Sequence, residues 1–493
     1  MKKRSAYLAI DFGTSNVHAS VIDAETTRII VNTNKKYGWY YPAQNQVELH
    51  IDETWKASEW AVGEVIRQLP EDVELLAITF SYFGDSITPV DEKGEALYGM
   101  IPGFCGRSFK EVQTIGREIG ADTYAKITGN TLSTLATPSK IMWLRDNEPE
   151  VFKKAAGFYS NQQYVMRKLG LGDVQDRTMA ARKLMIDVKA NCWSAPILEL
   201  AGVTEQQLGT QIVESATVVG TIDHYGSVRL PRTLPVTIGC HDVSASLLSA
   251  GVQLENPDTI GVLMGTYEQM GYFSDTFVDG CNDFGDSLIF SCCYSSPFNN
   301  KYTVMDAFPT AGALLEWFCK NILHDPSADI GKLIADAKLD GTGSLMMLPY
   351  VENFHGAVVG MSLSTTTDEI FAAILESLAY QFVACVDYIR STREQPFTKL
   401  HFGGGGSRTD KLLQLRADLI QAPLGRMQNI ELPSLGACML AGLGNNWYAS
   451  VEDAAAHMGN PVSYFEPIPE NETKYAERYA KYKAISADYL RRY

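Results

Sequence analysis

Apolar and polar residues alternate in short blocks near the N-terminus. Residues 7–10 are mostly apolar, residues 11–16 hold an acid, a glycine and small polar side chains, and residues 17–22 are mostly apolar again. Residues 28–32 form a further short apolar run after a polar turn. Runs of this length between turn residues predict three strands in an antiparallel meander. Walker loops and dinucleotide fingerprints place their glycines between a strand and a helix, so this pattern fits neither of them.

A second block of the same kind begins at Thr259. An apolar strand runs to Gly265 and Thr266 and a further strand continues toward Phe273, much as Gly13 precedes a threonine in the first block. Two such hairpins half a chain apart predict two lobes of similar build, each presenting a turn with a hydroxyl group to a shared cleft. Backbone amides of tight turns, with small hydroxyls beside them, suit phosphate oxygens. The alternative is that both segments are plain hairpins.

The remaining long segments have helical periods. Residues 139–155 show the period of two consecutive helices with a break between them, and residues 368–391 carry apolar side chains at helical spacing, as a long buried helix does. The chain has no Pro-rich or low-complexity linker, and we expect a hinge near residues 245–258. This hinge would divide the chain into a lobe of residues 1–245 and a lobe of residues 246–493.

A run of four glycines, Gly403 to Gly406, follows a short apolar strand. Ser407 and Asp410 have the spacing of a capping box, and an amphipathic helix is expected after them. Glycines without a Cβ let the backbone pass close to a flat or bulky ligand, as a nucleotide loop requires. A flexible turn is the alternative.

An aspartate, Asp242, stands between an apolar strand that ends at Gly239 and a helix of small residues from Val243 to Gly251. Aspartate is a common helix N-cap, and that role alone would account for it. The other interpretation places a carboxylate at the carboxyl end of a strand, where it can accept the proton of a hydroxyl group.

Composition narrows the possible functions. The 493 residues suggest two or three domains, and the formal net charge of -16, from 58 acidic and 42 basic residues, would repel a phosphate backbone. No pair of the nine cysteines has the spacing of a zinc or redox motif, as expected for reduced thiols. No apolar run approaches the roughly 20 residues of a membrane helix. We expect a cytoplasmic protein with no nucleic-acid or membrane partner.

These segments, in this order, resemble the FGGY family of carbohydrate kinases, which belongs to the fold class of actin, hexokinase and the 70-kDa chaperones. The resemblance implies an α/β fold of two ribonuclease H-like lobes with a central cleft. It also implies phosphate transfer from ATP to a small sugar with Mg²⁺ as the metal. Three further segments carry the resemblance: residues 137–155, 187–203 and 347–377.

The resemblance also implies roles for single residues. Asp11 would help to hold the magnesium ion, and Asp242 would be the catalytic base and a sugar contact. The first hairpin, the second hairpin, a glycine before a tryptophan and the glycine-rich run would bind the nucleotide. The residues concerned are Gly13, Thr14, Ser15, Gly265, Thr266, Gly312, Gly404, Gly405, Gly406 and Ser407.

The sequence departs from the family pattern on the sugar side. Arg107 is kept, but Cys105 stands where an aspartate is expected, and Gln163 replaces another common aspartate. Asp85 is the candidate for the missing carboxylate, and a solvated turn residue is the alternative. The acceptor is therefore expected to be a ketose or a polyol, with a sugar acid bound by Arg107 as a further option.

Two other functions remain open for this fold. A catalytically impaired, sugar-responsive nucleotide-binding protein would keep the lobes and lose turnover, and an actin-like or chaperone-like ATPase would hydrolyse ATP without any sugar. The expected partners are the sugar and ATP, and a homodimer is a further expectation.

Overall fold

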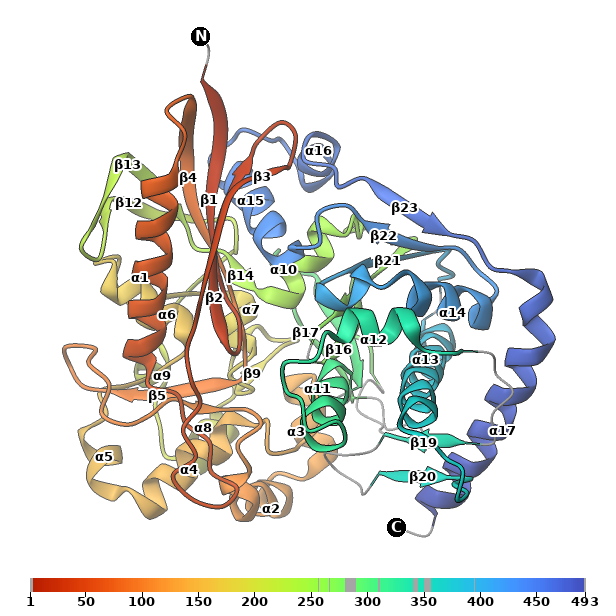
Figure 1. The fold of residues 1–493 in the computed structure, drawn as a ribbon. Coiled ribbons are helices and arrows are strands. Elements are labelled where there is room, and N and C mark those ends of the chain that lie inside the picture. The colour runs from red at the N-terminus through yellow and green to blue at the C-terminus, as the bar shows by residue number, and fades with distance from the viewer. Residues whose placement is uncertain are drawn as a thin grey trace.

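The first lobe is built on a seven-stranded sheet (Figure 1). The computed structural model describes residues 3–255, 257–265, 267–279, 290–308, 311–339, 345–349, 356–393 and 395–491. The sheet has the order β12-β13-β4-β1-β2-β3, with β14 beside β4. Its strands are β1 (Arg4–Phe12), β2 (Asn16–Asp23), β3 (Ile29–Lys36), β4 (Val73–Tyr82), β12 (Val218–Tyr225), β13 (Val228–Thr237) and β14 (Cys240–His241). The antiparallel meander predicted for β1, β2 and β3 is confirmed.

Side chains alternate between the two faces of this sheet, as the period of a strand requires. Leu8 and Ile10 of β1 pack on the face that α1 (Ile51–Gln68) covers. Tyr7 and Ala9 face the opposite side, against α15 (Leu432–Gly444) of the second lobe. Asp11 continues this second row, so the register directs its carboxylate toward the junction between the lobes.

The second lobe has a similar sheet, except that β18 rather than β17 lies beside β16. The strand order is β17-β18-β16-β15-β21-β22-β23, in which β16 pairs antiparallel with both β15 and β18 and β21 lies parallel to β15. The predicted hairpin is therefore confirmed as a copy of β1 and β2. The strands are β15 (Thr259–Met264), β16 (Glu268–Ser274), β17 (Phe290–Ser295), β18 (Tyr302–Phe308), β21 (Lys399–Gly403), β22 (Leu424–Met427) and β23 (Val462–Phe465).

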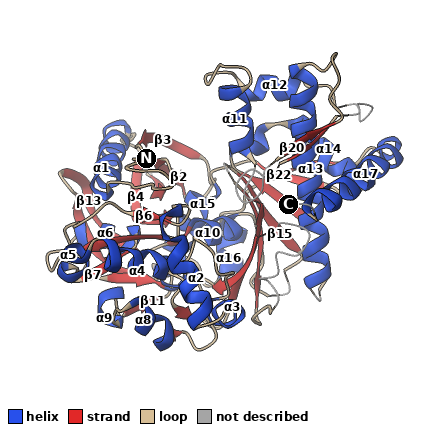
Figure 2. Ribbon diagram, turned by 90° about the horizontal axis from the view of Figure 1, so that it is seen from below, coloured by secondary structure: helices blue, strands red, loops and turns tan. Residues whose placement is uncertain are grey.

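Shorter elements of the first lobe surround its sheet, and Figure 2 shows most of them together on one side of the molecule. The strands are β5 (Ser86–Val90), β6 (Ile101–Pro102), β7 (Gly157–Tyr159), β8 (Val174–Asp176), β9 (Ile186–Asp187), β10 (Cys192–Trp193) and β11 (Gln211–Val213). The helices are α2 (Phe109–Glu118), α3 (Ala121–Thr128), α4 (Thr137–Asn147), α5 (Pro149–Lys154), α6 (Asn161–Lys168), α7 (Arg177–Ala181), α8 (Ala195–Ala201) and α9 (Glu205–Leu208). The two consecutive helices predicted from the sequence are α4 and α5.

The longest helix of the second lobe, within the described residues, is α13 (Thr367–Thr392). This is the long helix that the apolar spacing predicts. It is the one helix in the described ranges that is long and apolar enough to cross a membrane, but 72% of its apolar window is buried within the protein, as in a core helix. The other elements are α11 (Gly312–Asn321), α12 (Ile330–Asp336), α14 (Asp410–Ile420), α16 (Val451–His457), α17 (Glu472–Leu490), β19 (Met346–Leu348) and β20 (Ala357–Val359).

Two helices cross where the lobes meet. The first of them, α10 (Asp242–Ser249), packs against α15, which in turn packs on β1 and β4 of the first lobe. A Cβ at Gly436 of α15 would lie 1.8 Å from the carbonyl oxygen of Ala245, so only glycine permits this approach. The close crossing holds the first turn of α10, and Asp242 with it, at the junction of the two lobes.

Candidate active site

Three carboxylates lie at the carboxyl ends of neighbouring parallel strands. Asp11 of β1 and Cys240 of β14 both pair in register with Ser81 of β4. Asp242 follows Cys240 by two residues, and Asp85 follows the end of β4 by three. In open α/β sheets, ligands bind outside the carboxyl ends of the parallel strands, so the register places these acids where a ligand is expected.

Asp242 is the first residue of α10, and His241 occupies the N-cap position without a side-chain cap. The N-cap interpretation of Asp242 is therefore not supported. Its Oδ1 accepts the backbone N–H of Val243 at 2.7 Å and lies 3.2 Å from Nε2 of His241. Both of these contacts are made by Oδ1, so Oδ2 is the oxygen that can face an acceptor hydroxyl. About a quarter of the side chain stays exposed, at 28%.

Burial raises the pKa of Asp242 to about 8, and the negative charge of Asp11 acts in the same direction. A carboxylate with this pKa binds its proton near neutral pH more firmly than an ordinary aspartate does. A base whose pKa lies near the operating pH is well suited to proton transfer.

His241 connects Asp242 to the second lobe. Its Nδ1 lies 2.9 Å from the hydroxyl group of Tyr294 in β17. Burial and the charge of Arg182 lower the pKa of His241 well below its ordinary value, so the imidazole is neutral. A neutral ring has one donor and one acceptor, and we assign Nε2–H as the donor to Asp242 and Nδ1 as the acceptor from Tyr294.

A buried hydrogen-bond network fixes the backbone before Asp242. The hydroxyl group of Thr178 accepts the N–H of His241 at 2.8 Å and donates to Oδ2 of Asp176 at 2.8 Å. Ser215 donates to the same carboxylate oxygen at 2.6 Å. The network leaves little freedom to the residue before Asp242, and nothing in the sequence pattern pointed to it.

Asp85 lies in the left-handed backbone region, with φ of 54°, and forms an ion pair with Arg182 at 2.5 Å. Nη1 of Arg182 donates to Oδ1 of Asn130 at 2.9 Å, and its guanidinium group lies 5.0 Å from the centre of the Tyr294 ring. A Cβ at Gly84 would lie 3.1 Å from both Arg182 and His241, so the Asp85 pair and the Asp242 segment are packed together. Sequence reasoning missed Arg182 and Tyr294, which no motif marks.

Arg107 contacts other residues of the first lobe. Its side chain has no exposed surface and pairs with Glu48 at 2.9 Å. It also donates to Sγ of Cys105 at 3.0 Å and to the carbonyl oxygen of Val47 at 3.1 Å, and it stacks 4.8 Å from the ring of Trp143. With its guanidinium group engaged within the lobe, we assign Arg107 a structural role and do not propose it as a sugar ligand.

Gln163, at the position of another expected aspartate, is also buried, and its side-chain amide donates to Asp173 at 2.6 Å. Its side-chain oxygen accepts a bond from the buried Lys183, whose pKa burial lowers to about 7. The residue therefore belongs to an internal polar cluster of the first lobe.

The first hairpin turn contains the predicted residues Gly13, Thr14 and Ser15. The N–H of Gly13 bonds to the carbonyl oxygen of Asn16 at 3.0 Å, and the hydroxyl group of Tyr37 donates to the carbonyl oxygen of Gly13. Thr14 is half-buried and Ser15 is exposed. The turn thus offers hydroxyl groups directly beyond Asp11, as phosphate binding would need.

The second hairpin meets the other predicted nucleotide residues. The N–H of Gly312, which begins α11, bonds to the carbonyl oxygen of Gly265 at 3.2 Å. A Cβ at Gly404 would lie 2.7 Å from the carbonyl oxygen of Met264, the residue before Gly265, and a Cβ at Gly406 would lie 2.9 Å from its side chain. The structure therefore brings the hairpin, the glycine-rich run and the start of α11 together. Thr266 lies outside the described residues.

The expected capping box at Ser407 and Asp410 is wrong. Helix α14 begins at Asp410 with Thr409 as its N-cap, and no side-chain cap is formed. The hydroxyl group of Ser407 donates instead to the carbonyl oxygen of Gly404 at 2.7 Å, which closes the turn. Nothing lies within 4 Å of the position of a Cβ at Gly405, so this part of the loop has room for a ligand.

The surroundings of Asp11 suit a carboxylate that binds a cation. Its Oδ1 accepts the hydroxyl group of Ser81 at 2.6 Å, and burial together with the nearby charge of Glu431 raises its pKa. In the described part of the chain no three His, Cys, Asp or Glu side chains gather as a metal cage. Mg²⁺ in kinase sites is usually held by one or two carboxylates, water and substrate phosphates, so the donor set fits this ion.

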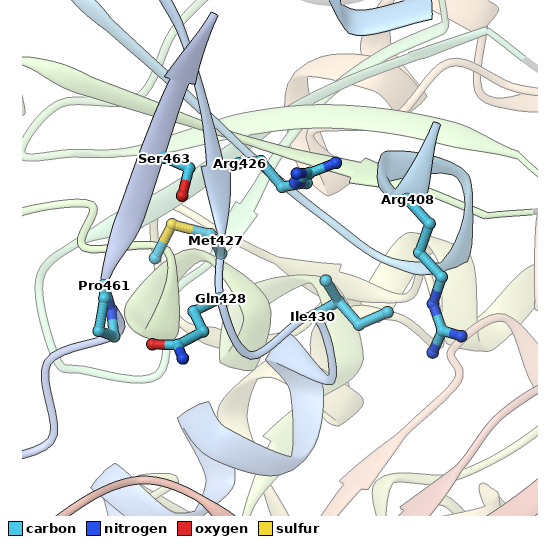
Figure 3. A pocket seen from close by; sticks show the side chains of 7 residues that line it. All are labelled: Arg408, Arg426, Met427, Gln428, Ile430, Pro461 and Ser463. Carbon is cyan, nitrogen blue, oxygen red and sulfur yellow. The ribbon is translucent and has the colours of Figure 1, made fainter. Parts of the chain in front are cut away.

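Two adjoining hollows lie beside the glycine-rich run, where Arg408 follows Ser407. They enclose about 640 and about 420 Å³ and share Arg408, Gln428, Ile430 and Pro461 among their lining residues (Figure 3). No residue predicted for the sugar, the metal or the nucleotide lines either of them. The site therefore rests on the strand ends and hairpins rather than on these hollows.

Comparison with models of known protein families identifies the family of this chain. Residues 6–249 match the N-terminal domain of the FGGY family of carbohydrate kinases, and residues 286–444 match its C-terminal domain. The chain belongs to this family. As an FGGY kinase it is a phosphotransferase that acts on an alcohol group of a sugar or polyol, and it binds ATP. The predicted fold class of two actin-like lobes is confirmed.

Individual relatives match nearly the full length of the chain at low sequence identity. The glycerol kinase of Desulforamulus reducens is 25% identical over 480 residues, which cover 92% of both chains. The xylulose kinase of Lactococcus lactis is 24% identical over 97% of this chain and 96% of its own. The crystal structure of a gluconate kinase from Lactobacillus acidophilus has a TM-score of 0.84 over the whole of both chains, with 18% identity, and shares the fold.

Proposed function

We propose that this FGGY kinase transfers the γ-phosphate of ATP to a hydroxyl group of a small ketose or polyol, with Asp242 as the general base. The observation that carries this proposal is the position of Asp242 at the carboxyl end of β14, with one carboxylate oxygen held by Val243 and His241. The other oxygen remains available to a hydroxyl group. Relatives that act on xylulose and on glycerol support an acceptor of this size.

Phosphoryl transfer passes through a loose transition state, so the protein chiefly positions the reactants and stabilises charge. Asp242 would orient the acceptor hydroxyl in line with the γ-phosphate and take up its proton as the new bond forms. The turns at Gly13 and Gly265 would offer amides and hydroxyls to the phosphate oxygens, and the run from Gly404 to Ser407 would pass beside the adenosine.

Magnesium would be held by Asp11 together with phosphate oxygens and water. When bound, it neutralises charge on the β- and γ-phosphates. Closure of the two lobes about the crossing of α10 and α15 would exclude water, which otherwise competes as an acceptor.

The test is ADP release with a panel of ketoses, polyols and sugar acids in the presence of ATP and Mg²⁺. We expect at least one neutral acceptor to raise ADP release far above the rate without acceptor. Uniform background rates despite saturable ATP binding would favour the sugar-responsive nucleotide-binding protein instead. ATP turnover that no acceptor changes would favour an actin-like ATPase.

The raised pKa of Asp242 predicts the pH dependence of turnover. The base works only as the carboxylate, so kcat/KM for the acceptor should fall tenfold per unit below the pKa of Asp242. That pKa should lie well above the ordinary value of about 3.9, within the range of pH 5 to about 8, because burial raises it even where a cation offsets the charge of Asp11. Rates measured from pH 5 to pH 9 would check this, and a flat profile over that range would contradict it.

A further inference from the structure

The ion pair between Asp85 and Arg182 contains two polar atoms without a partner. Oδ1 of Asp85 and Nε of Arg182 are both buried, and neither forms a hydrogen bond in the structure. Buried polar atoms are nearly always paired, so two such atoms on one ion pair call for an explanation. The Asp85 side chain is 18% exposed, so the pair lies next to solvent-accessible surface.

The pair also belongs to the site that contains the base. Gly84, next to Asp85, packs tightly on both Arg182 and His241, and the charges of Asp85 and Arg182 both act on Asp242. A ligand on the pair would therefore lie beside the carboxylate that activates the hydroxyl group.

We propose that Asp85 and Arg182 form a clamp for an uncharged acceptor, in which a hydroxyl group donates to Oδ1 of Asp85 and the same or the adjacent hydroxyl accepts from Nε of Arg182. This inference rests on the proposed kinase function and specifies its substrate class as neutral polyols and ketoses, not sugar acids. Arg182 becomes a specificity-determining residue that sequence reasoning did not identify. A hydroxyl group is both donor and acceptor, which matches one orphan acceptor and one orphan donor.

Charge balance is the reason for excluding sugar acids. The positive charge of Arg182 is already offset by Asp85 at 2.5 Å, so a substrate carboxylate would gain no uncompensated partner. It would instead meet the negative charge of Asp85 in a largely buried setting, where like charges repel strongly. The other arginine considered for a sugar acid, Arg107, is enclosed with Glu48.

The clamp is also rigid. Asn130 holds Nη1 of Arg182, the ring of Tyr294 lies against its guanidinium group, and its side chain is 2% exposed. A Cβ at Gly103 would lie 2.8 Å from the Cβ of Asp85, so the backbone confines the acid as well. Groups held in this way need little reorganisation when a ligand binds, which favours recognition of a defined spacing of hydroxyl groups.

The experiment measures binding directly, so that it does not depend on turnover. Calorimetric titrations of the full chain, with a non-hydrolysable ATP analogue and Mg²⁺, would compare polyols and ketoses of three to six carbons with aldonates of the same carbon number. We expect a neutral compound to bind at least about tenfold more tightly than its matched aldonate. Equal or tighter binding of the aldonate, or no binding by any member of the panel, would overturn the clamp.

Variants then identify the residues responsible. Arg182→Gln should weaken the best neutral ligand by roughly 10- to 100-fold, as loss of a hydrogen bond to a charged group does. Asp85→Asn removes the negative charge and keeps the size, so it should shift the preference toward the aldonate by at least about tenfold. If Arg182→Gln does not fold, Arg182→Lys, which keeps the charge and loses Nε, should weaken the neutral ligand in its place.

Arg107→Gln is the matched control, because Arg107 is an equally buried arginine paired with an acid of the same lobe. It should lower the thermal midpoint and leave the ratio of neutral to acidic binding unchanged. A change in that ratio for Arg107→Gln, or none for Asp85→Asn, would overturn the assignment. ADP release on the same panel separates the two proposals: selective binding without ADP release contradicts only the kinase, and ADP release with a neutral acceptor whose binding Arg182→Gln and Asp85→Asn leave unchanged contradicts only the clamp.

Discussion

Asp242→Asn should lower kcat by roughly 10²–10⁴-fold, the usual contribution of a positioned general base. Asparagine keeps the size of the side chain and can still accept the N–H of Val243, but it cannot take up the proton of the acceptor hydroxyl. Because the change removes an interaction needed only as the bond forms, KM for ATP should change little. Steady-state rates with the best acceptor from the panel provide the measurement.

The same variant separates catalysis from stability. The folded-state pKa of Asp242, about 8, lies above the value of an unfolded chain, so the wild type loses free energy of unfolding as the pH rises toward 8. Asparagine has no such charge to bury. We expect the thermal midpoint of the variant to equal or exceed that of the wild type at pH 8.5, without Mg²⁺.

Two results would contradict the assignment. A variant that keeps more than about a tenth of wild-type turnover would show that Asp242 is not the base, since the loss would fall below the range for a general base. A thermal midpoint that falls by many degrees would show that the side chain chiefly supports the fold.

Much of the fold could be predicted because local patterns specify it. The apolar run from Tyr7 to Ile10 predicts a strand, and the polar residues after it predict the turn that follows. The second lobe repeats the pattern, so its hairpin could be found by comparison with the first. Both predictions depend only on neighbours in the sequence.

The sugar side could not be predicted in the same way, because its contacts join residues distant in the sequence. Arg182 reaches Asp85 across 97 positions, and Tyr294 reaches His241 across 53. Arg107 has the charge that a sugar-acid ligand would need, and the structure pairs it with Glu48 and stacks it on Trp143. Sequence patterns indicate residue type and local conformation, but not which acid each of the two arginines pairs with.

Asp11→Asn should lower activity at saturating ATP by at least about 10²-fold, comparable with the loss of one preorganised electrostatic contact to developing charge. The Mg²⁺ concentration needed for half-maximal activity should rise as well, because the amide is a neutral and weaker ligand than the carboxylate. Initial rates over a range of Mg²⁺ concentrations at fixed ATP would measure both effects.

The same change that lowers activity should not lower the stability of the protein, if Asp11 serves the metal. Burial raises the pKa of Asp11, so its ionised form costs free energy of unfolding above the ordinary aspartate pKa. Asp11→Asn should therefore leave the thermal midpoint without Mg²⁺ unchanged or higher at pH 8.

Asp306→Asn is the control: burial raises the pKa of Asp306 to about 7 in the second lobe, and no role in the site is proposed for it. That variant should change stability without changing the Mg²⁺ dependence. If Asp11→Asn instead lowered the midpoint by many degrees and left the Mg²⁺ dependence as in the wild type, Asp11 would be a structural residue and another group would have to hold the metal.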